Sequence, residues 1–174
     1  MTPDTGIDFE RLSLQDALDL AVLIEEEARD RYVEFAEQLG THHTPDVADF
    51  FARMAQIEER HRSELFQRRQ TLFGDAPPTV HRGQLFDVEA PGYEEARAFM
   101  GVRQALETVL AAEVKAHAFF EEALPRVKDP ELRALFQELR DEEVHHQALV
   151  KTELARCPQK PDDSGAYADD PVAQ

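Results

Sequence analysis

Residues 20–36, LAVLIEEEARDRYVEFA, carry the feature from which the architecture follows: a glutamate in the middle of an apolar helix face. Apolar residues recur in and around this segment at spacings of three and four, as on the buried side of an amphipathic helix. Glu25 falls on that side, between Val22 and Ala28. Burying an ionised carboxylate without a partner costs several kcal/mol, so a proton or a cation has to compensate Glu25.

The same interruption occurs in three further segments with helical periodicity. Glu113 stands alone in the middle of one apolar face, as Glu25 does. In the other two segments the interruption is a Glu-x-x-His pair, Glu58 with His61 and Glu142 with His145. Residues three apart lie on one side of a helix, so the two members of each pair can reach the same metal ion.

Four helices are predicted, and their connections indicate how they pack. Ser13 with Asp16, and Asp129 before a proline, are helix-start signals, and Gly40 is a stop signal. The predicted helices run from about Leu14 to Leu39, Thr44–Pro45 to Leu72, Tyr93 to Leu124, and Asp129–Pro130 to Ala155. Two short connections and one long one, residues 74–92, are typical of a ferritin-like antiparallel four-helix bundle with a crossover between its second and third helices. The fold class is therefore all-α.

The two predicted hairpins resemble each other in register. When Glu25 is placed over Glu113, Tyr32 falls on Phe120. When Glu58 is placed over Glu142, their histidines also coincide. A single Glu-x-x-His motif often arises by chance, but its recurrence at matching points, each preceded by a lone buried Glu, favours a metal site over a set of solvated charges.

One Glu from each of two helices, with Glu-x-x-His from each of the other two, is the pattern of di-iron carboxylate bundles. Two divalent ions would balance four carboxylates, and oxygen and imidazole ligands suit Fe, with Mn or Zn as alternatives. We expect Glu58 and Glu142 to bridge the two ions. The predicted metal ligands are Glu25, Glu58, His61, Glu113, Glu142 and His145.

Several neighbouring residues are left open. His146 would replace His145 if the last helix were rotated. Tyr32 and His117 are candidates for positions beside the metal ions. We expect the remaining acids next to the ligands to be surface charges, and three histidines in loops to be solvated. These are Glu26, Glu27, Glu59 and Glu143, and His42, His43 and His81.

Composition restricts the partners and the location. The formal net charge of −17 disfavours binding to nucleic acids and to anionic membranes. Cys157 is the single cysteine, no signal-peptide pattern occurs at the start, and no apolar run is long enough for a membrane span, so the cytoplasm is expected. We expect residues 1–156 to form the domain, and residues 157–174 to form an acidic, disordered tail.

The segment EEEARDRY, residues 25–32, resembles the first-helix motif of the rubrerythrin branch of the ferritin-like superfamily, in which a ligand Glu precedes Ala-Arg-x-Arg-Tyr. Glu58 with His61 and Glu142 with His145 are similar to its second- and fourth-helix motifs, and Glu113 to its third-helix ligand. The resemblance spans about 14–154. It departs at Ala116, where rubrerythrins commonly carry another Glu, and the rubredoxin module with its Cys-x-x-Cys pairs is absent from this sequence.

The resemblance implies oxidation of Fe(II) by dioxygen or hydrogen peroxide, as a ferroxidase or peroxide-scavenging oxidoreductase. Ala116 weakens the step from a di-iron site to a specialised peroxidase, and electrons would have to come from another protein or a small reductant. The alternatives are non-catalytic iron storage or delivery, as subunit or cargo of a larger shell, and a structural bundle that has lost its metals. By analogy with related bundles, we expect a homodimer.

Overall fold

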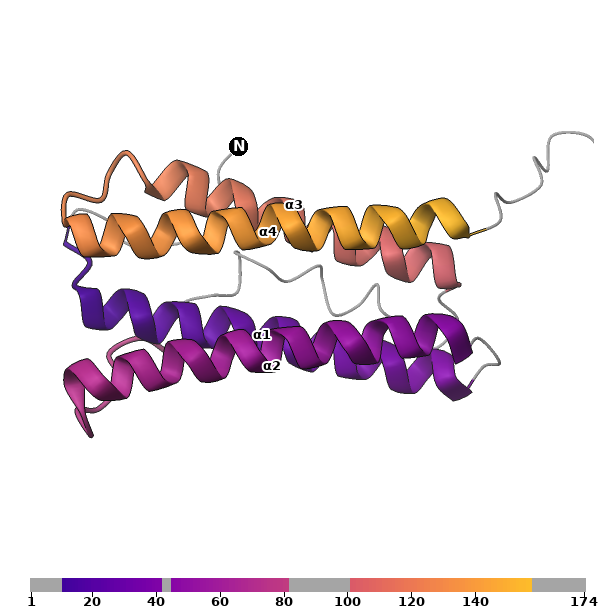
Figure 1. Cartoon of the computed structure of the whole chain (residues 1–174), viewed down its shortest axis with the longest axis horizontal. Helices are drawn as coiled ribbons and strands as arrows, with labels where there is room; N and C mark the ends of the chain where they lie inside the picture. Colours follow the sequence, from indigo (N-terminus) through magenta and orange to yellow (C-terminus); the bar gives the residue numbers. More distant parts are fainter. Residues whose placement is uncertain (1–10, 42–44, 82–100, 158–174) are drawn as a thin grey trace, which may run out of the picture.

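The protein is a bundle of four long helices arranged as two antiparallel hairpins (Figure 1). The computed structural model describes residues 11–41, 45–81 and 101–157, and these contain no strand. The helices are α1 (Leu14–Thr41), α2 (Pro45–Phe73), α3 (Val102–Ala123) and α4 (Pro130–Arg156). Helices α1 and α2 form one hairpin and α3 and α4 the other, which confirms the predicted fold class.

Local signals in the sequence start and stop these helices at three points, of which the first two were predicted. At the start of α1, the Ser13 hydroxyl accepts a hydrogen bond from the Asp16 amide at 3.1 Å, and the Asp16 carboxylate accepts one from the Ser13 amide at 3.0 Å. The Asp129 carboxylate caps α4 by accepting from the Leu132 amide at 2.9 Å. After α2, Gly74 adopts a φ of 56°, a left-handed conformation that glycine tolerates best.

Two predicted boundaries are wrong. Gly101 has extended backbone angles, φ −71° and ψ 158°, so the helix that carries Glu113 begins at Val102 and not near Tyr93. Residues 93–100 and the expected cap Thr44 lie outside the described residues. Gly40 does not stop α1, which continues to Thr41. Of the predicted tail 157–174, all residues after Cys157 are also outside the described residues, so its disorder stays a prediction.

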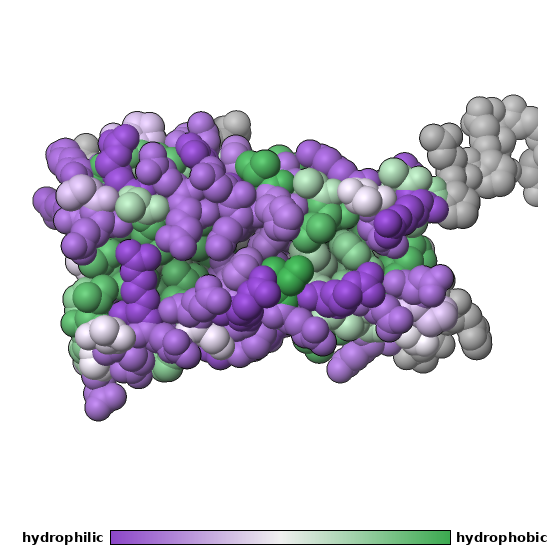
Figure 2. Space-filling model, viewed as in Figure 1, coloured by the Kyte–Doolittle hydropathy of each residue, from purple (hydrophilic) through white to green (hydrophobic). Residues whose placement is uncertain are grey.

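The core consists of two apolar clusters, one toward each end of the bundle. One contains Ile24, Leu65 and Phe120, and the other contains Phe51 and Val109. Polar side chains separate them at the middle of the bundle. Figure 2 shows a largely hydrophilic surface with apolar residues along the seam between the hairpins. None of the described helices is long and apolar enough to cross a membrane.

A buried ion pair holds the beginning of the crossover against the first hairpin. Arg69 of α2 and Asp19 of α1 are both buried, and their Nε and Oδ1 atoms lie 2.8 Å apart. The Arg69 guanidinium also donates to the carbonyl oxygens of Gly74 and Ala76. The amide of Thr79 donates to Asp19 Oδ2 at 3.1 Å. The chain leaving α2 is thereby fixed to α1.

Replacing Arg69 by methionine should destabilise the fold by about 3–5 kcal/mol, because Asp19 would then be buried without its cation. The measurement is the free energy of unfolding from urea denaturation. Arg68→Met is the matched control, since Arg68 is 40% exposed and its pair with Glu138 spans 3.6 Å. That change should cost at most about 1 kcal/mol. Equal losses in the two variants would contradict the structural role of the buried pair.

Candidate metal centre

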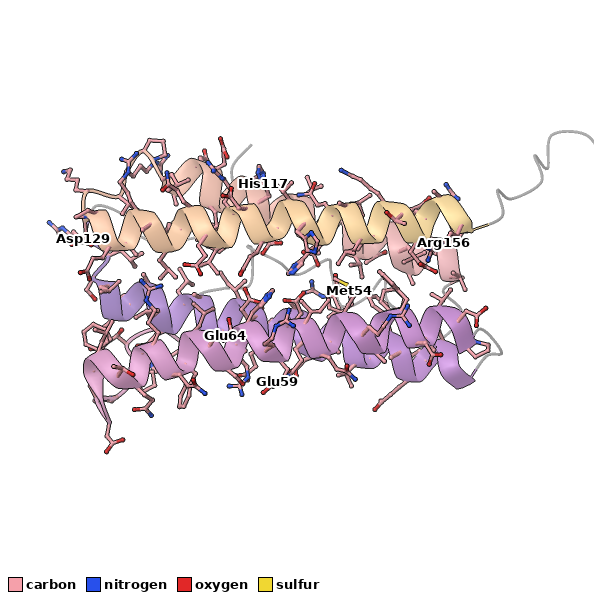
Figure 3. The ribbon with its side chains drawn as sticks, in the orientation of Figure 1. Met54, Glu59, Glu64, His117, Asp129 and Arg156 are labelled. Atoms are coloured by element: carbon pink, nitrogen blue, oxygen red, sulfur yellow. The ribbon has the colours of Figure 1, made fainter. Side chains whose placement is uncertain are left out.

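The polar middle layer of the bundle receives side chains from all four helices. It contains five glutamates and two histidines: Glu25 of α1, Glu58 and His61 of α2, Glu113 of α3, and Glu142, Glu143 and His146 of α4. Figure 3 shows Met54, one turn before Glu58 on α2, directed toward the space between the hairpins, whereas Glu59 points away from it. Each helix therefore presents at least one acid to the same central layer.

One group of ligating side chains surrounds His61. Its Nδ1 atom lies 3.7 Å from Glu25 Oε2 and 3.8 Å from Glu142 Oε2. These three residues form what we call the outer group. Within it the potential ligand atoms lie within 4.8 Å of one another, a separation that one metal ion can span.

A second group surrounds His146, whose Nδ1 atom lies 3.4 Å from Glu113 Oε2. With Glu143 these two residues form the inner group, and all three side chains are buried. Glu58 belongs to both surroundings, because its Oε2 lies 3.8 Å from His61 Nδ1 and its Oε1 lies 3.3 Å from His146 Nδ1. A carboxylate between two groups suits two ions that share it.

The two histidine rings lie parallel, with centroids 5.4 Å apart and an interplanar angle of 8°. His61 Nδ1 and His146 Nε2 are both buried and make no hydrogen bond. Buried polar nitrogens normally have a partner, so two such atoms in one layer indicate that the protein binds ions there. Imidazole nitrogen with carboxylate oxygen is a donor set for Fe, Mn or Zn, and the residues therefore fit a pair of such ions.

Tyr32 connects the inner group to the apolar cluster around Phe51. Its hydroxyl donates a hydrogen bond to Glu113 Oε1. Burial, with the nearby Glu113 and Glu58 charges, raises the pKa of Tyr32 well above its usual value, so the phenol keeps its proton. Burial opposes ionisation of Glu113, but its interactions with His146 and Tyr32 outweigh this and lower the pKa of the carboxyl.

The outer group favours bound protons in the absence of a metal ion. Interaction with Glu25 raises the pKa of His61 against the opposing effect of burial, and Glu142 contributes further. Burial raises the pKa of the Glu142 carboxyl. A metal ion bound here would have to displace these protons, as is general for sites built from imidazole and carboxylate.

The structure brings together five of the six predicted ligands and moves the sixth. His145 is exposed and lies outside both groups, so the expectation that it faces the core is wrong. His146, 2% exposed, takes the inward position. Glu143 is 3% exposed, so its assignment as a surface charge is also wrong. Glu142 contacts only the outer group, which does not match the bridging position predicted for it.

The remaining candidates divide between the site and the surface. Tyr32 lies beside the centre, as predicted. His117 lies outside both groups and is half-buried on α3 (Figure 3). Its Nε2 atom lies 3.9 Å from Glu121 Oε2. Glu59 is a surface charge as expected, paired with Arg29 at 2.7 Å. His81 is exposed, while His42 and His43 lie outside the described residues.

A signal for the correct face of α4 was present in the sequence. A spacing of three and four residues repeats without interruption through both acidic pairs. On α2 the series is Phe51, Met54, Glu58, His61 and Leu65, and on α4 it is Phe136, Leu139, Glu143, His146 and Val150. Placing Phe136 over Phe51 would have selected Glu143 and His146.

Comparison with known proteins agrees with this geometry. The model of the rubrerythrin family matches residues 16–154. The chain belongs to the rubrerythrin family. Membership implies a di-iron carboxylate centre, and the Glu and His groups of the central layer are the side chains that could hold it.

A solved structure similar to this rubrerythrin-family chain is an uncharacterised conserved protein from Magnetospirillum magnetotacticum MS-1. The two are 26% identical, with a TM-score of 0.73, and the match covers 86% of this chain and 98% of the other. No curated protein matches the chain.

The two adjacent histidines of α4 provide a direct test of the site. His146→Ala should remove one of the two ions bound per chain, because it deletes the buried nitrogen of the inner group. His145→Ala should leave binding unchanged, because that ring is exposed. Calorimetric titration of metal-free protein with Zn²⁺ measures both. Loss of an ion in His145→Ala, with unchanged binding in His146→Ala, would show that α4 presents its other face to the metals.

Proposed function

We propose that this protein is a di-iron oxidoreductase that oxidises Fe(II) with hydrogen peroxide or dioxygen. The observation that carries the proposal is the pair of ligand groups sharing Glu58, each with a buried imidazole nitrogen that has no hydrogen bond. Two adjacent one-electron metal ions suit the two-electron reduction of peroxide. Ferrous ion is the substrate whose electrons are consumed.

The arrangement assigns ligands to each half of the centre. Glu25, His61 and Glu142 would hold one iron. The inner group would hold the other, with Glu58 reaching both. Five carboxylates face two divalent ions, so four are balanced and one negative charge remains. That residual negative charge favours oxidation of the ions, because oxidation adds positive charge, which the extra carboxylate partly neutralises.

When bound, two ferrous ions supply two electrons, which reduce one hydrogen peroxide to two waters with uptake of two protons, leaving two ferric ions. The protein contributes the surroundings of this reaction. The apolar clusters on either side of the layer, which include Met54, Val109 and Leu139, limit access of water. Tyr32 keeps its proton and holds one oxygen of Glu113, which fixes the orientation of that carboxylate.

The stoichiometry of iron oxidation tests the proposal and separates it from storage. Anaerobic protein loaded with Fe(II) and then given hydrogen peroxide should oxidise two irons per peroxide, with about two irons bound per chain. Glu25→Ala and Glu113→Ala should each lose an iron. The readouts are ferrous ion remaining, measured with a chelating dye, and peroxide remaining.

Iron binding in both variants equal to that of the natural chain would overturn the proposal. Continued oxidation of many irons per chain, with ferric mineral retained, would favour storage. Glu131→Ala is a suitable control, because Glu131 is an exposed acid in the first turn of α4.

Tyr32→Phe tests the link between the apolar core and the centre. Two ions should still bind, since the hydroxyl oxygen belongs to neither ligand group. Affinity for the ion of the inner group should fall about tenfold, because a hydrogen bond to a charged group contributes about 1.5 kcal/mol. Titration with Co²⁺ monitored by absorption measures the two affinities. An unchanged inner affinity would show that the Tyr32 hydrogen bond does not orient Glu113 for metal.

A further inference from the structure

The two ligand groups differ in their access to solvent. In the inner group Glu113, Glu143 and His146 are 6%, 3% and 2% exposed. In the outer group Glu25 is 3% exposed, but the side chains of His61 and Glu142 are 12% and 32% exposed. A metal ion held by the inner group would be sealed from water, whereas one held by the outer group would have a ligand in contact with solvent.

Glu142 is the residue through which the outer group contacts solvent. Its neighbour Glu143 turns into the core, while Glu142 lies at the edge of the layer with one oxygen 3.8 Å from His61 Nδ1. Glu138, one turn earlier on α4, is 63% exposed and its charge acts on Glu142. Carboxylates therefore extend along α4 from the surface to the ligand group.

We propose that Glu142 is a metal ligand of the outer half alone, and that it makes this half the one that exchanges ions with solution. The inference rests on the proposed di-iron centre and adds an order to it: the inner ion is held tightly and exchanges slowly, and the outer ion exchanges through Glu142. In a symmetrical centre the two ions would behave alike.

The physical reason is the different cost of dehydrating an ion at the two positions. A cation can bind an exposed carboxylate while it keeps most of its water, and then exchange the remaining waters for Glu25 and His61. At the inner group all ligands are buried, so the ion has to lose its hydration shell before they replace it. Glu58 lies near both histidines, so it is the carboxylate that the two metal positions share.

Titration of metal-free protein with Co²⁺, followed by absorption, tests the assignment. The natural chain should bind two ions in two steps. In Glu142→Gln the tighter step should stay unchanged and the weaker one should fall by at least about tenfold, because even the loss of a partner that only orients a metal ligand costs about that much in affinity. Glu142→Asp keeps the carboxylate and should lose less. Removal by excess chelator should show one fast and one slow ion in the natural chain.

The matched control is Asp141→Asn, which removes the same charge from the adjacent residue. Asp141 is 69% exposed and pairs with Arg140 at 2.9 Å, so both binding steps should be unaffected. Glu143→Gln should weaken the tighter step instead. Thermal melting of each metal-free variant checks that the bundle is intact.

The outcomes separate the two proposals. If the natural chain does not bind two ions, the di-iron function itself fails. If it binds two but Glu142→Gln leaves both steps unchanged, or weakens both equally, only the outer-half assignment fails. If Asp141→Asn lowered the affinity of the weaker step as much as Glu142→Gln does, the assignment would also be overturned. The effect would then come from the change in net charge and not from the loss of a metal ligand.

Discussion

Buried carboxylates in the middle of the bundle are the constraint on which the rest of this structure depends. Glu25, Glu58, Glu113 and Glu143 are nearly inaccessible to solvent and lie within one layer. Their mutual repulsion and their loss of hydration would each oppose folding, so the layer requires protons or cations. The other features follow from this: histidines beside the acids, a tyrosine hydroxyl that donates a hydrogen bond to one carboxylate, and apolar clusters that confine the charge to the centre.

The centre has the approximate twofold repetition of the chain, but its two halves have different environments. Each hairpin supplies one lone Glu and one Glu-x-x-His pair, and the two imidazole rings lie parallel. The additional acid Glu142 breaks this symmetry, because the equivalent position on α2, one residue before Glu58, is occupied by Ile57. The repetition therefore supplies two ligand groups, and the departure from it gives these two groups different environments.

The fold and most of the site could be predicted because they depend on local rules. Helix starts at Ser13 and Asp129 follow from side-chain hydrogen bonds to the first turn. Glu25 and Glu113 stood out because a single acid in an otherwise apolar helix face is too costly to bury without a compensating charge. The start of α3 was missed, because the extended conformation of Gly101 is not evident from periodicity.

The order of the residues was enough to establish a helical bundle with acids and histidines at its centre, since spacing along one helix decides which side chains share a face. Two registers of α4 fit an apolar spacing of three and four residues, and the tertiary structure decided which of them turns inward. A shift of one residue rotates a helix by about 100° and exchanges His145 for His146. Packing of Phe136, Leu139 and Val150 between the hairpins selects the rotation, because burying these three side chains stabilises the fold whichever acid accompanies them.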